Sequence, residues 1–164
     1  IHSKLALKQL GISSENVSAI SNLANYIKRL KLKDPLVVSP DQGGTERAKK
    51  FAHVLKTDFV ALKKNRDRKT GRINIVTAKV SVKDRDLILV DDMISTGGSI
   101  IKATQFLKKQ KCRRVYVACT HGLFVNGAEK KIKQAGVTQI ISTNTIPSNS
   151  SKVDVSKILA ESLL

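Results

Sequence analysis

The stretch Leu87-Ile88-Leu89-Val90-Asp91-Asp92-Met93-Ile94-Ser95-Thr96-Gly97-Gly98-Ser99 decides the fold of this 164-residue chain. Its four leading apolar residues predict a buried strand, two carboxylates follow, and a turn of small residues opens a helix. Open α/β sheets hold their ligands at strand ends of this kind. Small residues let backbone N–H groups close around a phosphate at the helix N-terminus, and the carboxylates suit sugar hydroxyls or a divalent metal. The stretch therefore predicts a sugar-phosphate site.

Five short apolar runs predict strands that are buried on both faces of a sheet. They cover residues 36–39, 59–62, 87–90, 115–119 and 139–142. Helical patterns occupy residues 14–30, 45–55, 99–109, 126–134 and 153–164. The alternation of strands and helices favours a parallel sheet with right-handed crossovers. We therefore expect a doubly wound α/β domain with a mainly parallel, five-stranded sheet.

Two polar segments depart from this alternation. Residues 63–72 are dense in Lys and Arg, and residues 73–82 then alternate like a half-buried strand. We expect residues 63–82 to form a projecting, flexible arm or hairpin that carries cations toward the ligand edge; the plain alternative is a solvated charge run. Residues 147–152 are rich in Ser and Asn and predict a loop.

The net charge of +17 first suggests a nucleic-acid partner. The lysines, however, are scattered along the chain, and four Phe and two Tyr offer few surfaces for base stacking. A polyanionic small substrate explains the charge as well, so a nucleic-acid partner is not the favoured expectation. No apolar run approaches the ~20 residues of a membrane span. Cys112 and Cys119 fit neither a redox pair nor a zinc set, and we expect a cytoplasmic protein without a membrane partner.

A second glycine-containing loop, Ser39-Pro40-Asp41-Gln42-Gly43-Gly44-Thr45, follows the first predicted strand. Alone it is an ordinary turn as readily as a site, because Pro and Gly punctuate loops everywhere. Beside the first loop it offers a second phosphate or diphosphate site at Gly43, Gly44 and Thr45, and a carboxylate at Asp41 for Mg²⁺. Neither loop matches the motif of a P-loop ATPase or of a dinucleotide-binding fold.

The adjacent carboxylates of Asp91 and Asp92 favour a functional site over a plain capped turn. Two such groups repel each other, and they are costly to keep at a partly buried sheet edge without a ligand or metal. His121, which follows the fourth predicted strand, is a candidate residue of the same cleft.

These segments, in this order, resemble the C-terminal half of ribose-phosphate pyrophosphokinase, also called phosphoribosyl pyrophosphate synthetase. The resemblance covers essentially the whole chain and implies a domain of phosphoribosyltransferase type over residues 1–164. The matching stretches are residues 35–52 (first phosphate loop), 58–67 (catalytic arm), 90–99 (phosphoribosyl loop), 120–124 and 143–147. Many phosphoribosyltransferases share the phosphoribosyl loop, whereas the arm together with the other segments is more specific.

The resemblance implies that the diphosphoryl group of ATP is transferred, with Mg²⁺, to the 1-hydroxyl of ribose 5-phosphate. It implies that Lys64 steadies this group in transit and that Arg66 helps to bind substrate. Asp91, supported by Asp92, would hold the ribose hydroxyls. The residues that would wrap the 5-phosphate are Ser95, Thr96, Gly97, Gly98 and Ser99. Asp41 and His2 resemble the family's metal-associated residues, and homo-oligomers are usual in the family.

The chain departs from the family pattern in two places. Many members have Asp where this chain has Ser95, which removes a ribose contact or a negative charge. The Asp of the family's Asp-x-His metal motif would precede Ile1, as would the segment that holds adenine. The start of this chain is therefore expected to overlap the end of a missing N-terminal domain.

Two other functions stay open at this point. A phosphoribosyltransferase that uses phosphoribosyl pyrophosphate to modify a base would share residues 91–99 but gives no reason for the Lys64-x-Arg66 arm. A non-catalytic regulatory relative of the same fold is disfavoured by the intact Lys64, Arg66 and Asp91. The charge of +17 keeps a nucleic-acid-binding version of that relative open, and salt-dependent DNA or RNA binding would favour it.

Overall fold

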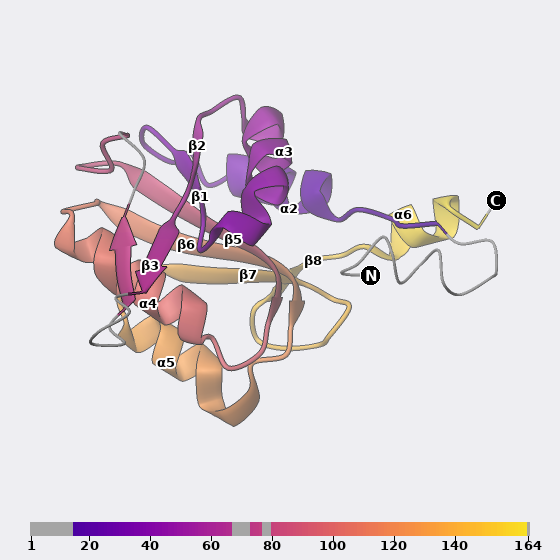
Figure 1. Cartoon of the computed structure of the whole chain (residues 1–164). Coiled ribbons are helices and arrows are strands. Elements are labelled where there is room, and N and C mark those ends of the chain that lie inside the picture. Colours follow the sequence, from indigo (N-terminus) through magenta and orange to yellow (C-terminus); the bar gives the residue numbers. More distant parts are fainter. Residues whose placement is uncertain (1–14, 67–72, 77–79, 164) are drawn as a thin grey trace.

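A computed structural model describes residues 15–66, 73–76 and 80–163 of the chain (Figure 1). Six strands form one sheet: β1 (Leu36–Ser39), β2 (Phe59–Ala61), β5 (Asp86–Ile94), β6 (Arg114–Gly122), β7 (Gln139–Thr143) and β8 (Ser151–Val153). Their order is β2-β1-β5-β6-β7-β8, and every neighbouring pair is parallel. All the carboxyl ends therefore lie along one edge, with β5 near the middle.

Helices cover both faces of this sheet, as Figure 1 shows. Those on one face are α2 (Ile20–Lys28) and α3 (Thr45–Leu55); those on the other are α4 (Gly98–Lys109) and α5 (Ala128–Gln134). Helix α6 (Ser156–Glu161) follows β8, and the short 3₁₀ turns η1 (Gln42–Gly44) and η2 (Val125–Gly127) precede α3 and α5. The expected doubly wound α/β domain is confirmed. Within the described part of the chain, no helix has the length and apolar character to cross a bilayer.

The apolar run that opens β5 supplies both cores. Leu87 and Leu89 pack toward α4 and α5, whereas Ile88 and Val90 pack toward α2 and α3. Successive side chains of a strand point to opposite faces, so a continuous apolar run suits a sheet that is covered on both sides. Each such side chain adds roughly 1.5–3 kcal/mol when fully buried. This burial fixes the position of the strand whose end forms the candidate site.

The sheet has six strands rather than the expected five, because residues 151–153, at the junction of the predicted loop 147–152 and the predicted helix 153–164, form β8. The Ser142 N–H donates to the Ser150 carbonyl, and the Asn144 N–H donates to the Val153 carbonyl. An edge strand pairs on one side only, so it can be short and polar. It consequently lacks the apolar run by which the other strands were predicted.

The expected hairpin is present as a separate two-stranded sheet of β3 (Lys63–Arg66) and β4 (Ile73–Val76). The two strands are antiparallel, and Lys64 pairs with Ile75. Strand β3 follows the edge strand β2 after one buried residue, Leu62. Residues 67–72 and 77–79 lie outside the described part of the chain, as do the side chains of Lys64 and Arg66.

The amino ends of the strands are held by an ion-pair network around the buried Asp86. Asp86 accepts hydrogen bonds from the Lys33 N–H (2.8 Å), Arg113 (3.0 Å) and Arg114 (2.9 and 3.1 Å). Burial acts to raise the pKa of Asp86, but the hydrogen bonds and charges of its partners outweigh burial and hold the pKa below its ordinary value. Asp86 therefore has a structural role, at the edge of the sheet opposite the carboxyl ends of the strands.

Candidate functional site

The acid pair at the end of β5 converges on one guanidinium group. Arg47, from the first turns of α3, places Nη1 3.0 Å from Asp91 Oδ1 and Nη2 2.8 Å from Asp92 Oδ2. The three side chains are between 21% and 29% exposed. In a regular strand neighbouring side chains point to opposite faces. Here both carboxylates reach the same partner, and the Asp91 carboxylate also accepts the Asp92 N–H at 2.9 Å.

The surroundings of Asp91 disfavour the charged form of its carboxyl group. Burial and the neighbouring Asp92 carboxyl raise the pKa of Asp91 to about 6, although the positive charge of Arg47 acts to lower it. The expected repulsion between the two carboxylates is therefore only partly offset by Arg47. A ligand that brings hydroxyl donors or a cation to this point would relieve it.

The turn that follows β5 is shaped to receive an anion. Gly97 has φ of 74°, α4 begins at Gly98, and no side chain of the described residues caps this helix start. The N–H groups of a first helical turn have no partner within the helix, so they can bind phosphate. Gly97 is also required by packing, because a Cβ there would lie 2.7 Å from Ile132 Cδ1 of α5. The turn is thus held in place by the neighbouring helix.

The second loop is ordered by its own side chains. Asp41 Oδ1 accepts the Gly44 N–H at 3.3 Å, and the Thr45 hydroxyl donates to the Gln42 carbonyl at 2.7 Å. The Ser39 hydroxyl donates to the Asp41 carbonyl at 2.7 Å. In this arrangement the N–H of Gly44 already donates to Asp41. The phosphate-binding role of Gly43, Gly44 and Thr45 therefore stays a prediction. The loop's clear contribution is to start α3 where Arg47 can reach β5.

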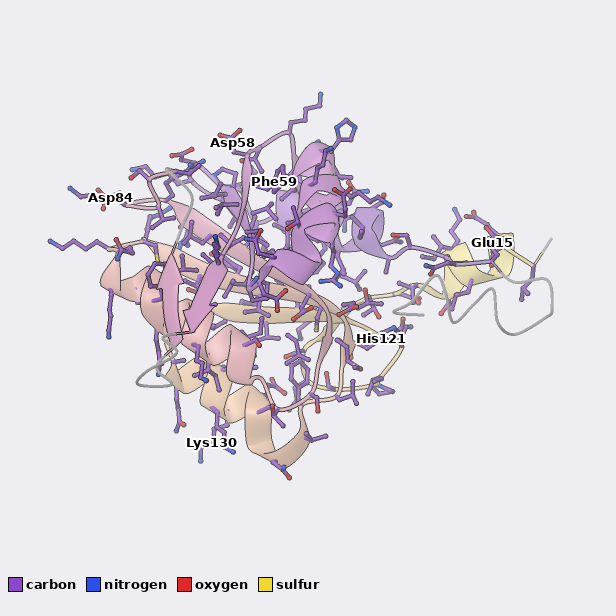
Figure 2. The ribbon with its side chains drawn as sticks, viewed as in Figure 1. Glu15, Asp58, Phe59, Asp84, His121 and Lys130 are labelled. Carbon is purple, nitrogen blue, oxygen red and sulfur yellow. The ribbon has the colours of Figure 1, made fainter. Side chains whose placement is uncertain are left out.

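A cavity of about 660 Å³ adjoins the acid pair. Its lining includes Arg47 and Lys50 of α3, Asp92 of β5 and His121 of β6. His121, labelled in Figure 2, lies at the carboxyl end of β6, and its Nδ1 is 2.9 Å from the Thr145 hydroxyl. His121 thus lines a cavity beside Asp92, and its place in the ligand site stays a prediction. Charges of both signs line this cavity, whereas Asp91 and residues 95–99 are not among its lining residues.

The structure brings some of the predicted residues together and leaves others outside. Asp91 and Asp92 adjoin the turn of residues 95–99, and both predicted loops lie at one edge of the sheet. His2, the expected metal residue, lies outside the described residues. Within the described ranges, no three His, Cys, Asp or Glu side chains gather as a metal cluster.

Sequence reasoning missed Arg47, although it holds both carboxylates. Arg47 lies in the predicted helix of residues 45–55, close to Lys49 and Lys50. Nothing in a single sequence separates these three cations, because the partners of Arg47 lie more than forty residues away. Only the pairing of β1 with β5 brings the start of α3 to the acid pair.

Residues 8–157 match the family described as phosphoribosyl transferase domain. The chain is 36% identical over 166 residues to a ribose-phosphate pyrophosphokinase of Sulfurisphaera tokodaii, which covers 99% of this chain and 57% of that protein. A ribose-phosphate pyrophosphokinase of Pyrococcus furiosus is 36% identical over 155 residues, covering 94% of this chain and 54% of that protein. The chain therefore spans about half the length of the curated relatives it matches.

Solved structures show the same relationship. Phosphoribosylpyrophosphate synthetase from Mycobacterium smegmatis superimposes with a TM-score of 0.75 at 30% identity, covering 88% of this chain and 49% of that one. A purine phosphoribosyltransferase from Pyrococcus horikoshii shares the fold, with a TM-score of 0.53 at 22% identity over 63% of this chain and 70% of that one. The resemblance to ribose-phosphate pyrophosphokinases is confirmed, and the chain belongs to the phosphoribosyl transferase domain family.

Proposed function

We propose that this chain supplies the sugar-phosphate-binding and catalytic part of an enzyme that makes 5-phosphoribosyl 1-pyrophosphate. The enzyme transfers the diphosphoryl group of ATP to the 1-hydroxyl of ribose 5-phosphate and releases AMP. The observation that carries the proposal is the junction at the end of β5, where the Asp91–Asp92 pair adjoins the Gly97 turn. The similarity to ribose-phosphate pyrophosphokinases supports the choice of reaction.

Ribose 5-phosphate would be held at both of its ends. Its phosphate would accept N–H groups of residues 95–99, and its ring hydroxyls would donate to the carboxylates of Asp91 and Asp92. A sugar held in this way loses its freedom to rotate before reaction, which is a large part of the barrier in a two-substrate transfer. Ser95, where the family resemblance implies an Asp in many members, would contribute a hydroxyl rather than a charge.

The transfer itself needs no side-chain nucleophile. The 1-oxygen of the sugar forms a bond to the β-phosphorus of ATP, the bond between the β-phosphorus and the α-phosphate oxygen breaks, and AMP leaves while the hydroxyl proton goes to solvent. Lys64 and Arg66, on the β3–β4 hairpin, would meet the charge that develops on the transferred group. Hence the proposed roles of these residues are electrostatic.

The residues present fit a magnesium ion. Mg²⁺ keeps several waters and is usually bound through one or two carboxylates plus substrate phosphates, so it needs no cage of protein ligands. Asp41 lies in the second loop, and the acid pair adds oxygen donors at the same edge of the sheet. Asp41 and His2 are the proposed protein ligands. The ion, when bound, would neutralise part of the phosphate charge.

The test is an assay of AMP release from ATP and ribose 5-phosphate by the full-length protein that carries this chain, because the chain spans only about half the length of its curated relatives. We expect AMP and phosphoribosyl pyrophosphate to appear in equal amounts, with the same rate in a Lys109→Ala control on the exposed surface of α4. No AMP, together with release of pyrophosphate from phosphoribosyl pyrophosphate when a base is added, would assign a phosphoribosyltransferase instead. Expected homo-oligomerisation stays a separate prediction.

A further inference from the structure

We propose that Arg47 is a positioning residue that aims both carboxylates of the acid pair at the sugar and couples the second loop to the first. The inference deepens the proposed function and rests on it. Arg47 lies within residues 35–52, the stretch matched to the first phosphate loop, but the resemblance assigns it no role. Its assignment comes from the geometry at the end of β5 alone.

Arg47 spans the two carboxylates with separate nitrogens. Nη1 contacts Asp91 and Nη2 contacts Asp92, at 3.0 and 2.8 Å. A planar guanidinium that donates in two directions fixes the angle between its partners, which a lysine ammonium cannot do. Each carboxylate is also held by a backbone N–H, since Met93 N donates to Asp92 Oδ1 at 2.8 Å. The carboxylates are therefore pinned from two sides before any ligand arrives.

The second loop leaves space for this arginine. A Cβ on Gly44 would lie 3.0 Å from Arg47 Nη1, and it would also meet the Ser39 hydroxyl. Gly44 is buried and sits one residue before α3. A side chain at position 44 would thus clash first with the Ser39 hydroxyl and would crowd the Arg47 guanidinium as well. This gives Gly44 a reason to be glycine that does not depend on a bound phosphate.

A purely stabilising role accounts for the arrangement poorly. Partly buried ion pairs lose solvation that their mutual attraction only just repays, so they are weak contributors to stability. Removing all three charged groups would relieve the repulsion between the carboxylates as well. Retaining two acids and one base at the ligand edge is useful when the direction of the carboxylates matters.

The experiment measures binding of ribose 5-phosphate and of inorganic phosphate by calorimetry. It compares the unaltered protein with Arg47→Gln, Arg47→Lys and Lys49→Gln. Lys49 is exposed on the same helix, and Lys49→Gln removes the same charge as Arg47→Gln. Inorganic phosphate reports on the turn of residues 95–99 without involving ring hydroxyls. Thermal unfolding of each variant shows that it is folded.

Arg47→Gln should weaken ribose 5-phosphate binding about 10-fold or more, as loss of a residue that orients a ligand group commonly does. Binding of inorganic phosphate should stay within about 2-fold, Arg47→Lys should be intermediate, and Lys49→Gln should change neither ligand. Two results overturn the inference while leaving the proposed function standing. One is an Arg47→Gln variant that matches Lys49→Gln; the other is an equal loss for both ligands, which makes Arg47 a phosphate contact. If the unaltered protein binds ribose 5-phosphate no better than phosphate, the proposed function itself fails.

Discussion

Replacing Asp91 by Asn is expected to stabilise the protein at neutral pH while it damages the site. The pKa of Asp91 is raised from 3.8 to about 6 by burial and by Asp92. A carboxyl whose pKa is higher in the folded chain adds stability that is complete below about pH 3.8 and is lost as the pH rises through about 6. At ~1.4 kcal/mol per pKa unit, this difference corresponds to about 3 kcal/mol lost by neutral pH.

Asp91→Asn removes that pH-dependent loss, and the pKa of about 6 already includes the attraction of Arg47. We therefore expect a gain of up to about 3 kcal/mol in the free energy of unfolding at pH 7.5. The assay is urea unfolding of both proteins between pH 4 and pH 7.5. Subtracting one free energy of unfolding from the other removes the contribution of the other carboxyls, which titrate in both proteins. The advantage of the variant should grow as the pH rises through 6, and ribose 5-phosphate binding should be lost. A pH-independent difference, or a variant that is less stable at pH 7.5, would refute the reasoning.

Three further changes test other parts of the structure. Gly97→Ala places a Cβ at φ of 74° and against Ile132, so urea unfolding should show a loss of about 2–4 kcal/mol, which a smaller residue at position 132 partly restores. Asp86→Ala leaves the Lys33 N–H without its acceptor while the partly exposed arginines can turn to solvent, and should cost about 1–3 kcal/mol; since the pKa of Asp86 is lowered, its contribution is present at neutral pH and should fade in acid. Lys64→Ala should lower AMP formation at least about 100-fold with an unchanged thermal midpoint, and equal activity would remove Lys64 from the mechanism.

The parts of the fold that local pattern determines were predictable from the sequence. The run 87–90 is apolar on both faces and is fully buried, and the predicted helix of residues 45–55 matches α3. The ends of the helices and strands were predicted less accurately than their centres. Strand β5 continues through the acid pair to Ile94, and α2 begins at Ile20 rather than near residue 14. Strand β8 was missed because an edge strand needs no apolar run.

The residues of the candidate site also divide into those that the sequence predicts and those that it does not. Asp91, Asp92 and the glycine turn could be predicted because their chemistry lies in consecutive residues. Arg47 could not, because its role depends on a contact across 44 residues of sequence. The packing of Gly97 against Ile132 of α5 is likewise a contact between residues far apart in the sequence. Sequence patterns thus located the ligand edge, whereas the charge balance inside it required the three-dimensional arrangement.

The most direct test of the central claim is a crystal structure of the protein with ribose 5-phosphate. The account predicts that the phosphate lies on the backbone N–H groups of residues 95–99, with ring hydroxyls donating to Asp91 or Asp92. A sugar phosphate bound elsewhere, or an empty turn at a concentration that saturates binding in solution, would contradict it.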